Sequence, residues 1–174
     1  KQSGAPALRY RPWLEAAAVA AVMVLGMAVR LFWLGRWSFW PDEIFSFGAR
    51  ADGFNDSVLL RSLATDLIAW TVRVLGPSEW NARLVPALIG IATIPLLYLV
   101  VRRCLSFPGA LFTILLLALS PWHLYWSQNA RFYTLLFLFF NLGLLLFYRG
   151  IEEDRPWYLA AALVLFGLAA RERL

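Results

Sequence analysis

Cysteine, histidine and charge are all scarce in this 174-residue sequence. Its single cysteine, Cys104, excludes a disulfide bond within the chain. The sequence also has no zinc-binding motif, no phosphate-binding loop, no dinucleotide-binding glycine motif and no hydrolase nucleophile elbow. These absences count against hydrolases built on such motifs and against nucleotide-dependent enzymes.

Charged residues make up only 16% of the chain, against about 25% in an average soluble domain. Hydrophobic residues make up 61%, and the mean hydropathy is +0.64. A membrane helix needs roughly 20 mostly apolar residues, and the candidate spans lie at about 14–35, 84–101, 109–126, 132–148 and 156–170. We therefore predict an all-α, polytopic membrane helix bundle. Its first span exceeds the apolar core of a secretory signal, so we expect it to be retained.

The net charge of +5 comes from arginines that are scattered between the spans rather than gathered on one face. This pattern favours contact with anionic membrane lipids over nucleic acid as a partner. Aromatic residues make up 16% of the chain, and many tryptophans fall near predicted span ends, where indole rings favour the membrane interface.

Arginine pairs flank the first two spans at Arg9, Arg11, Arg102 and Arg103. The preference of arginine and lysine for cytoplasmic loops assigns both pairs, and the N-terminus, to the cytoplasmic side. Further arginines in the loop after the first span weaken this bias, but they are spread over a much longer segment. On this topology the Asp42 loop and residues 127–131 lie together on the outer face.

The outer segment 44–83 alternates apolar residues with charges, so its first part has no window of about 20 apolar residues. Such a pattern predicts amphipathic helices that lie along the membrane surface. Gly76-Pro77 should break the first of these helices, and Ser78 should start a new one that carries Arg83 into the second span.

Two adjacent acids, Asp42 and Glu43, follow the first span directly. A charge that faces lipid costs roughly 2.5 to 3.5 kcal/mol on insertion scales. The position of two acids next to a membrane span therefore needs a structural or functional explanation. Neighbouring side chains diverge, so one acid can face a cavity while the other braces the backbone. The structural alternative is that both acids stabilise the N-terminus of a helix that begins near Ile44.

A second polar cluster runs from Ser120 to Tyr133, and its Ser-Pro pair ends one span. Arg131 either snorkels to water or grips a phosphate with its planar guanidinium. A lone His123 is more often a hydrogen-bonded interfacial side chain than a base or ligand. Arg30, inside the first span, is expected to pack against other helices or to snorkel.

Three segments in order resemble the GT-C superfamily of membrane glycosyltransferases, in its protein O-mannosyltransferase-like and aminoarabinose-transferase-like branch. They are the first span running into Trp40-Pro41-Asp42-Glu43, then Glu79-Trp80-Asn81-Ala82-Arg83-Leu84-Val85-Pro86-Ala87-Leu88, then Ser120-Pro121-Trp122-His123-Leu124-Tyr125-Trp126-Ser127-Gln128-Asn129-Ala130-Arg131-Phe132-Tyr133. From the start of the first segment to the end of the last, they extend over about residues 14–133, which is most of the chain.

The resemblance implies an enzyme that moves a sugar from a polyprenyl-phosphate lipid to an acceptor at the outer membrane face, with inversion at the sugar. It makes Asp42 the general base and Glu43 its neighbour in the catalytic motif. Arg131, Gln128 and Tyr133 match the stretch that binds the donor phosphate, and His123 and Arg83 are possible substrate contacts. The membrane would be a bacterial inner (plasma) membrane. The active site would face outward, on the periplasmic or lumenal side.

The sequence departs from the family in three places. Asn129 replaces an acid that is common in relatives, and Leu63-Ala64-Thr65-Asp66-Leu67-Ile68 stands where relatives have a His-Pro-Pro turn. Relatives are also several hundred residues long with about a dozen spans, so we expect this chain to be the N-terminal part of a longer transmembrane domain.

Two questions stay open at this point. The outer acids suit a hard divalent cation, but their spacing matches no recognised site; these acids are Asp42, Glu43, Asp52, Asp56 and Asp66. The alternative function is a non-catalytic subunit that binds or transports a polyprenyl lipid, with the two acids serving only the helix N-terminus.

Overall fold

The computed structural model of the chain describes residues 11–48 and 62–172, and these residues form eight helices and no strand. The helices are α1 (Pro12–Leu31), α2 (Pro41–Gly48), α3 (Leu63–Leu75), α4 (Glu79–Val101), α5 (Phe107–Leu119), α6 (Pro121–Ser127), α7 (Tyr133–Glu152) and α8 (Pro156–Arg171). The predicted all-α helix bundle is confirmed.

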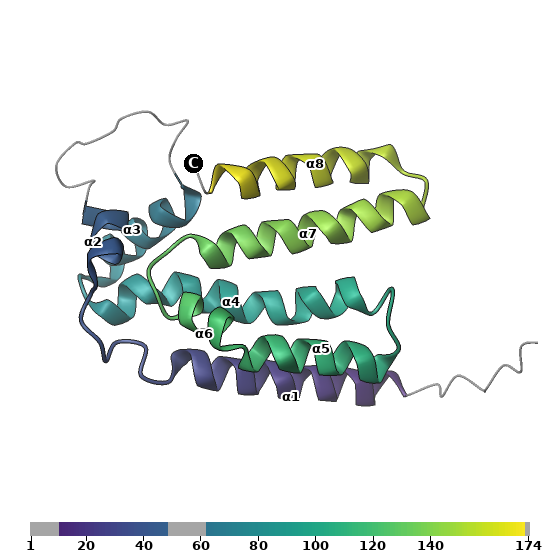
Figure 1. The fold of residues 1–174 in the computed structure, drawn as a ribbon, viewed down its shortest axis with the longest axis horizontal. Coiled ribbons are helices and arrows are strands. Elements are labelled where there is room, and N and C mark those ends of the chain that lie inside the picture. The colour runs from purple at the N-terminus through teal and green to yellow at the C-terminus, as the bar shows by residue number, and fades with distance from the viewer. Residues whose placement is uncertain (1–10, 49–61, 173–174) are drawn as a thin grey trace, which may run out of the picture.

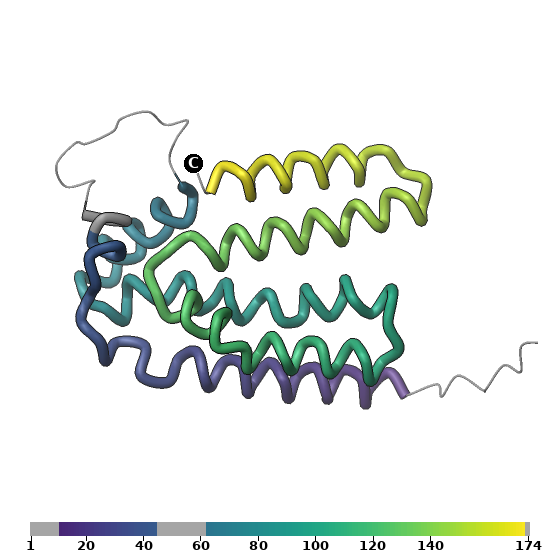
Figure 2. The backbone as a smooth tube through the Cα atoms, viewed as in Figure 1, coloured from purple at the N-terminus to yellow at the C-terminus, as the bar shows by residue number. Residues whose placement is uncertain are grey.

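The long helices α1, α4, α5, α7 and α8 run side by side, and the chain passes back and forth between the two ends of the bundle (Figure 1, Figure 2). The short helices α2, α3 and α6 gather at one end, which we call the α2 end. The connections α4–α5 and α7–α8 lie at the opposite end. The segments before Asp42 and after Ser127 therefore meet at the same end of the bundle.

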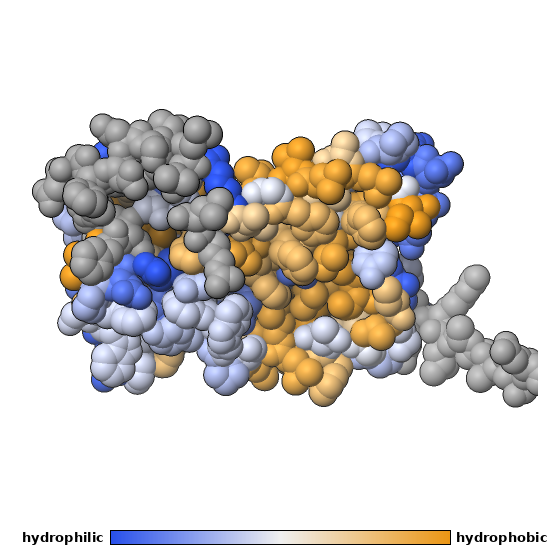
Figure 3. Space-filling model, turned by 45° about the horizontal axis from the view of Figure 1, so that its top comes forward, coloured by the Kyte–Doolittle hydropathy of each residue, from blue (hydrophilic) through white to orange (hydrophobic). Residues whose placement is uncertain are grey.

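Three helices, α1, α4 and α7, are long and apolar enough to cross a membrane, and α5 with α6 makes a fourth candidate if the bent pair is one span. The fifth predicted span, 156–170, is the shorter apolar helix α8. On the face that Figure 3 shows, apolar residues cover the middle of the bundle and polar residues gather towards its ends. This distribution suits an integral membrane protein.

The predicted span 109–126 is not one straight helix. It breaks at Ser120, and the axes of α5 and α6 differ in direction by 55°. The cause is local, because Pro121 has no N–H to donate and pushes the residue before it out of the helical region. Ser120 accordingly has an extended backbone with φ −60° and ψ 120°, and its side chain accepts a hydrogen bond from His123 N.

The predicted helix start at Ser78 is confirmed, because its hydroxyl accepts a hydrogen bond of 3.1 Å from Asn81 N. No separate short helix follows: α4 continues from Glu79 through the predicted second span to Val101. Pro86 and Pro95 lie within this helix. Membrane helices tolerate internal prolines because neighbouring groups satisfy the freed carbonyls.

Within the predicted outer segment, α3 has a buried face with Ala64, Ile68 and Thr71, while Trp70 and Val74 are exposed on another. Ile68 packs against Ala82 of α4 and Ala130. An apolar exposed face suits a helix that lies in the membrane interface, as the sequence predicted. Asp52, Asp56 and Arg61, like Arg9, lie outside the described residues.

The N-terminus of α3 is capped from the far end of the chain. The buried Glu172 carboxylate, just after α8, accepts hydrogen bonds from Ser62 Oγ at 2.6 Å, Leu63 N at 2.8 Å and Ala64 N at 3.1 Å. Helix N-terminal N–H groups lack partners within the helix, so this carboxylate ties α3 to α8. No local sequence pattern indicates a cap that comes from 108 residues away.

The exposed Cys104 tests the predicted orientation without an engineered site, because it lies in the α4–α5 connection. If the N-terminus is cytoplasmic, a membrane-impermeant maleimide should label Cys104 in inverted vesicles or permeabilised cells but not in intact cells. A Trp122→Cys, Cys104→Ser protein should show the opposite pattern, because Trp122 is exposed at the α2 end. Labelling of Cys104 in intact cells would reverse the topology.

Candidate functional site

The turn from α1 into α2 places the two acids on different sides of the chain. α2 begins at Pro41, so Asp42 and Glu43 both lie in its first turn, where a carboxylate is stabilised by the helix N-terminus. Glu43 Oε2 accepts a hydrogen bond of 3.3 Å from Trp40 N. Glu43 is 0% exposed, whereas 55% of the Asp42 side chain is exposed.

The Glu43 carboxylate lies at the centre of the α2 end. Arg83 of α4 grips it with two hydrogen bonds, from Nε to Oε1 at 2.9 Å and from Nη2 to Oε2 at 2.7 Å. Ala130 N donates to the same Oε1 at 2.7 Å. Both carboxylate oxygens are therefore occupied by protein groups, and the geometry gives Glu43 a bracing position rather than an exposed catalytic one.

Arg83 also fixes the loop that leads to the acids. Its Nη1 donates to the carbonyls of Leu34 at 3.2 Å and Trp37 at 2.8 Å, and its Nη2 donates to Ser38 O at 3.3 Å. One buried guanidinium thus joins α4, the α1–α2 loop and Glu43. The sequence suggested Arg83 as a possible substrate contact. In the structure, however, most of its N–H groups donate to the protein itself.

The predicted convergence of Asp42 and Arg131 is present in the structure. Arg131 Nη1 donates to the Asp42 backbone carbonyl at 2.8 Å, and its Nη2 lies 4.0 Å from Asp42 Oδ2. These residues are 89 positions apart in the sequence. A partly exposed carboxylate therefore lies beside a guanidinium, 20% of whose side chain is exposed.

Gln128 and His123 lie deeper than the sequence suggested. Gln128 Nε2 donates to the carbonyls of Val29, Arg30 and Phe32 at 3.0, 3.2 and 3.1 Å, so its amide nitrogen is used at the end of α1. The buried His123 contacts Arg30 rather than the surface. Arg30 packs against other helices, as predicted, and does not snorkel.

A cavity of about 440 Å³ opens between the Asp42 loop and the segment that follows α6. Its lining residues come from the α1–α2 loop, α4 and the α6 region: Trp37, Ser38, Trp40, Arg83, Tyr125, Gln128 and Asn129. Trp40 is two residues from Asp42, and Asn129 is two residues from Arg131. Ligand pockets commonly measure about 300 to 1,000 Å³, so this one has room for a small ring.

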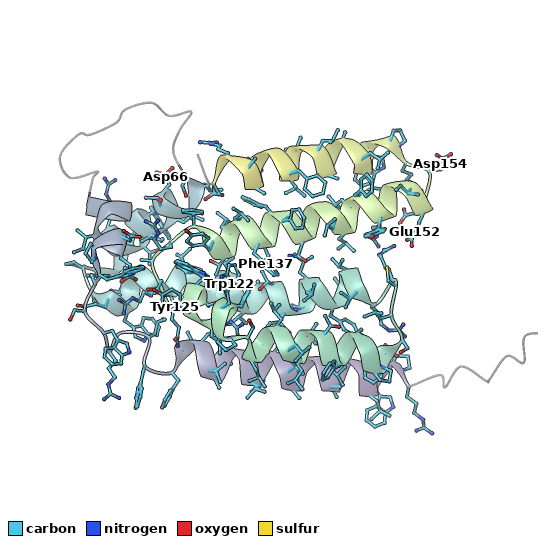
Figure 4. All side chains as sticks on the ribbon, in the orientation of Figure 1. Asp66, Trp122, Tyr125, Phe137, Glu152 and Asp154 are labelled. Atoms are coloured by element: carbon cyan, nitrogen blue, oxygen red, sulfur yellow. The ribbon has the colours of Figure 1, made fainter. Side chains whose placement is uncertain are left out.

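Tyr133 belongs to a chain of aromatic rings at the same end. Its ring lies 3.9 Å from that of Trp126, which contacts Tyr125 at 4.9 Å; Tyr125 in turn meets Trp40 at 6.3 Å. Figure 4 shows Trp122 and Tyr125 on α6 at the α2 end, far from Glu152 and Asp154. Amphipathic rings of this kind suit the boundary between lipid and water.

Asn129, where the resemblance led us to expect an acid, donates its side-chain amide to Tyr125 O and lines the cavity. Within residues 11–48 and 62–172, no group of three or more histidine, cysteine, aspartate or glutamate side chains is arranged to hold a metal ion.

Comparison with known proteins adds one finding. The family model described as dolichyl-phosphate-mannose-protein mannosyltransferase matches residues 63–173. No curated protein and no solved structure matches the chain significantly. The matched region includes Arg83, the cavity residues of α6 and Arg131, but begins after the two acids.

The central position of Glu43 predicts a large difference between two neighbouring substitutions. Glu43→Ala leaves the buried Arg83 charge without its partner, and removing one partner of a buried ion pair costs about 3 to 5 kcal/mol. We expect a clear loss of thermal stability in detergent for Glu43→Ala and for Arg83→Met. Asp42→Asn, at an exposed carboxylate, is the control and should unfold at the wild-type temperature. Equal stability of all three proteins would contradict the bracing position.

Proposed function

Because the chain belongs to the dolichyl-phosphate-mannose-protein mannosyltransferase family, whose members are membrane glycosyltransferases of the GT-C type, we propose that it transfers a sugar from a polyprenyl-phosphate lipid to a hydroxyl acceptor. The observation that carries the proposal is the pairing of an exposed Asp42 carboxylate with the Arg131 guanidinium beside a small cavity. The family description makes a dolichyl-phosphate mannose and a protein acceptor the first substrates to test.

In this reaction the acceptor oxygen forms a bond to the anomeric carbon as the bond from that carbon to the phosphate oxygen breaks. The acceptor proton goes to a base, and the bonding pair leaves with the lipid phosphate. Attack from the face opposite the leaving group inverts the anomeric carbon. The site must therefore supply a base for the acceptor proton and a cation for the leaving phosphate.

Asp42 is the group that we assign as the base. Its carboxylate is more than half exposed, whereas Glu43 is enclosed by hydrogen-bond donors. A positioned general base typically contributes 10² to 10⁴-fold to the rate. Because Asp42 and Glu43 share the first turn of α2, the buried acid fixes the exposed one.

Arg131 is the group that we assign to the leaving phosphate. A guanidinium can bind a phosphate through two parallel hydrogen bonds, and it stabilises charge best where little water competes. In the structure it contacts Asp42, so a phosphate arriving at the site would take over part of that contact. Tyr133 is proposed to border the same phosphate, and Gln128 to hold the segment in place.

The cavity is proposed to receive the sugar. Trp37, Trp40 and Tyr125 supply apolar ring faces, while Ser38 and Asn129 supply polar groups that can orient hydroxyls. Two of its lining residues, Trp40 and Asn129, are two positions from Asp42 and Arg131 in the chain, which supports a ring bound near both charges. The active site then faces the membrane side that carries α2, which the positive-inside rule makes the outer side.

Asp42→Asn tests the base. The amide keeps the size of the side chain but accepts no proton at neutral pH, so kcat should fall by at least roughly 10²-fold while the KM for the donor changes little. Initial rates with a radiolabelled polyprenyl-phosphate sugar measure both constants. Full activity in Asp42→Asn protein would reject the base and favour a subunit that only binds lipid.

Arg131→Ala tests the phosphate contact. It should raise the KM for the donor and lower kcat together, because the same charge binds the ground state and stabilises the departing phosphate. Arg131→Lys should recover only part of the loss, since an ammonium lacks the planar fork. Arg149→Ala removes a half-exposed arginine at the opposite end of the bundle and serves as the control. Wild-type donor affinity and turnover in Arg131→Ala would exclude the assignment.

A further inference from the structure

Arg30 is a buried cation inside the bundle that the proposed chemistry does not use. It is 0% exposed, although it lies in the last turn of the membrane helix α1. Among the described residues it donates to backbone carbonyls and to one histidine, and no carboxylate is in ion-pair contact with it. An ionisable group within a membrane bundle is costly, so its partners indicate what it does there.

The partners lie at the break between α5 and α6. Arg30 Nη1 donates to Ala118 O at 3.1 Å and to Gly26 O of its own helix at 3.0 Å, and Nη2 lies 3.4 Å from Leu117 O. The last carbonyls of a helix have no partners within it, and here Pro121 removes one donor that would have continued it. Arg30 therefore caps the C-terminus of α5, where the helix dipole also favours a cation.

The cap is reciprocal. Gln128, just after α6, donates to the carbonyls of Val29, Arg30 and Phe32 at the C-terminus of α1. Each of the two helix ends is thus capped by a side chain from the other segment. Because satisfied backbone groups are required where water is scarce, neither segment can shift without leaving carbonyls unpaired.

His123 completes the contact from α6. Its Nδ1 lies 2.8 Å from Arg30 Nη2, and a guanidinium only donates, so Nδ1 must be the bare acceptor nitrogen. The proton then lies on Nε2, which faces Thr93 Oγ1 of α4 at 3.3 Å. His123 is accordingly a neutral link between α1, α4 and α6.

The α4 side of this cluster is packed tightly. A Cβ atom added to Gly90 would come within 2.3 Å of Ser127 Oγ and 3.3 Å of Arg30 Nε. The Ser127 hydroxyl also donates a hydrogen bond of 2.6 Å to His123 O. The end of α6 has little room to move relative to α4 and α1.

We infer that Arg30 is a positioning residue: with Gln128 and His123 it holds the α5–α6 bend, and this bend sets where Arg131 lies relative to Asp42. Arg131 follows the end of α6 by four residues, and Ala130 between them is anchored on Glu43. The effect on catalysis rests on the proposed function, whereas the effect on geometry does not. A misplacement of about 1 Å can cost on the order of 10²-fold in rate.

Spin-label distances test the geometry independently of any substrate. In a Cys104→Ser background, labels at the exposed Ile44 on α2 and the exposed Trp122 on α6 report how the two segments lie. In Arg30→Met protein in nanodiscs we expect the distance distribution to become roughly twofold broader. Arg149→Met, which removes an arginine at the opposite end, should leave it unchanged. An unchanged distribution in Arg30→Met would overturn the inference.

Kinetics on the same proteins test the catalytic consequence. Arg30→Met should lower kcat by on the order of 10²-fold with a much smaller change in the KM for the donor, because the defect lies in alignment. Arg30→Lys should recover part of kcat, since it keeps the charge but cannot reach all the carbonyls and His123 at once. A broadened distribution with wild-type kcat would show that the bend does not set the reactive geometry.

Two further outcomes are decided by the same design. If Arg30→Met fails to fold, Gln128→Met removes only the α1 half of the reciprocal cap and should broaden the distribution in the same way; a wild-type distribution there would refute the cap. If the wild-type protein transfers no sugar, the proposed function fails, while the spin-label result still decides whether Arg30 holds the bend.

Discussion

The arrangement at the α2 end depends on one buried carboxylate. Glu43 accepts hydrogen bonds from Trp40 N, from Arg83 and from Ala130 N, which belong to three segments far apart in the chain. In a site with little water, charge-assisted hydrogen bonds of this kind are strong, and an unmatched charge is expensive. The loop that carries Asp42 and the segment that carries Arg131 are thereby fixed to the same anchor.

A second constraint comes from the backbone. Within a membrane bundle every backbone N–H and C=O group needs a hydrogen-bond partner. The break at Ser120-Pro121 leaves carbonyls at the end of α5 without partners in their own helix. Arg30 satisfies them, and Gln128 does the same for α1. Polar side chains that look like candidates for substrate binding thus hold the helix ends, and this leaves Asp42 and Arg131 as the charged pair on the rim.

This division of contacts lets the proposed site be rigid at its base and open at its rim. The bracing groups are buried and satisfied by protein, so they do not change with the substrate. Asp42 and Arg131 are partly exposed and contact each other, so a ligand can exchange with part of that contact. The cavity beside them takes its shape from aromatic rings that the braced loop and α6 present.

The sequence alone determined that the protein is a membrane helix bundle, because scarce charge and long apolar runs admit few other folds. It also determined the helix start at Ser78 and, by counting spans, that Asp42 and Arg131 lie at one end. It could not say which of two adjacent acids is buried, that Arg30 caps α5 and Gln128 caps α1, or that Glu172 caps α3. These contacts join residues about 40 to 110 positions apart, and local periodicity carries no information about partners at that range. Only the packing of the helices decided them.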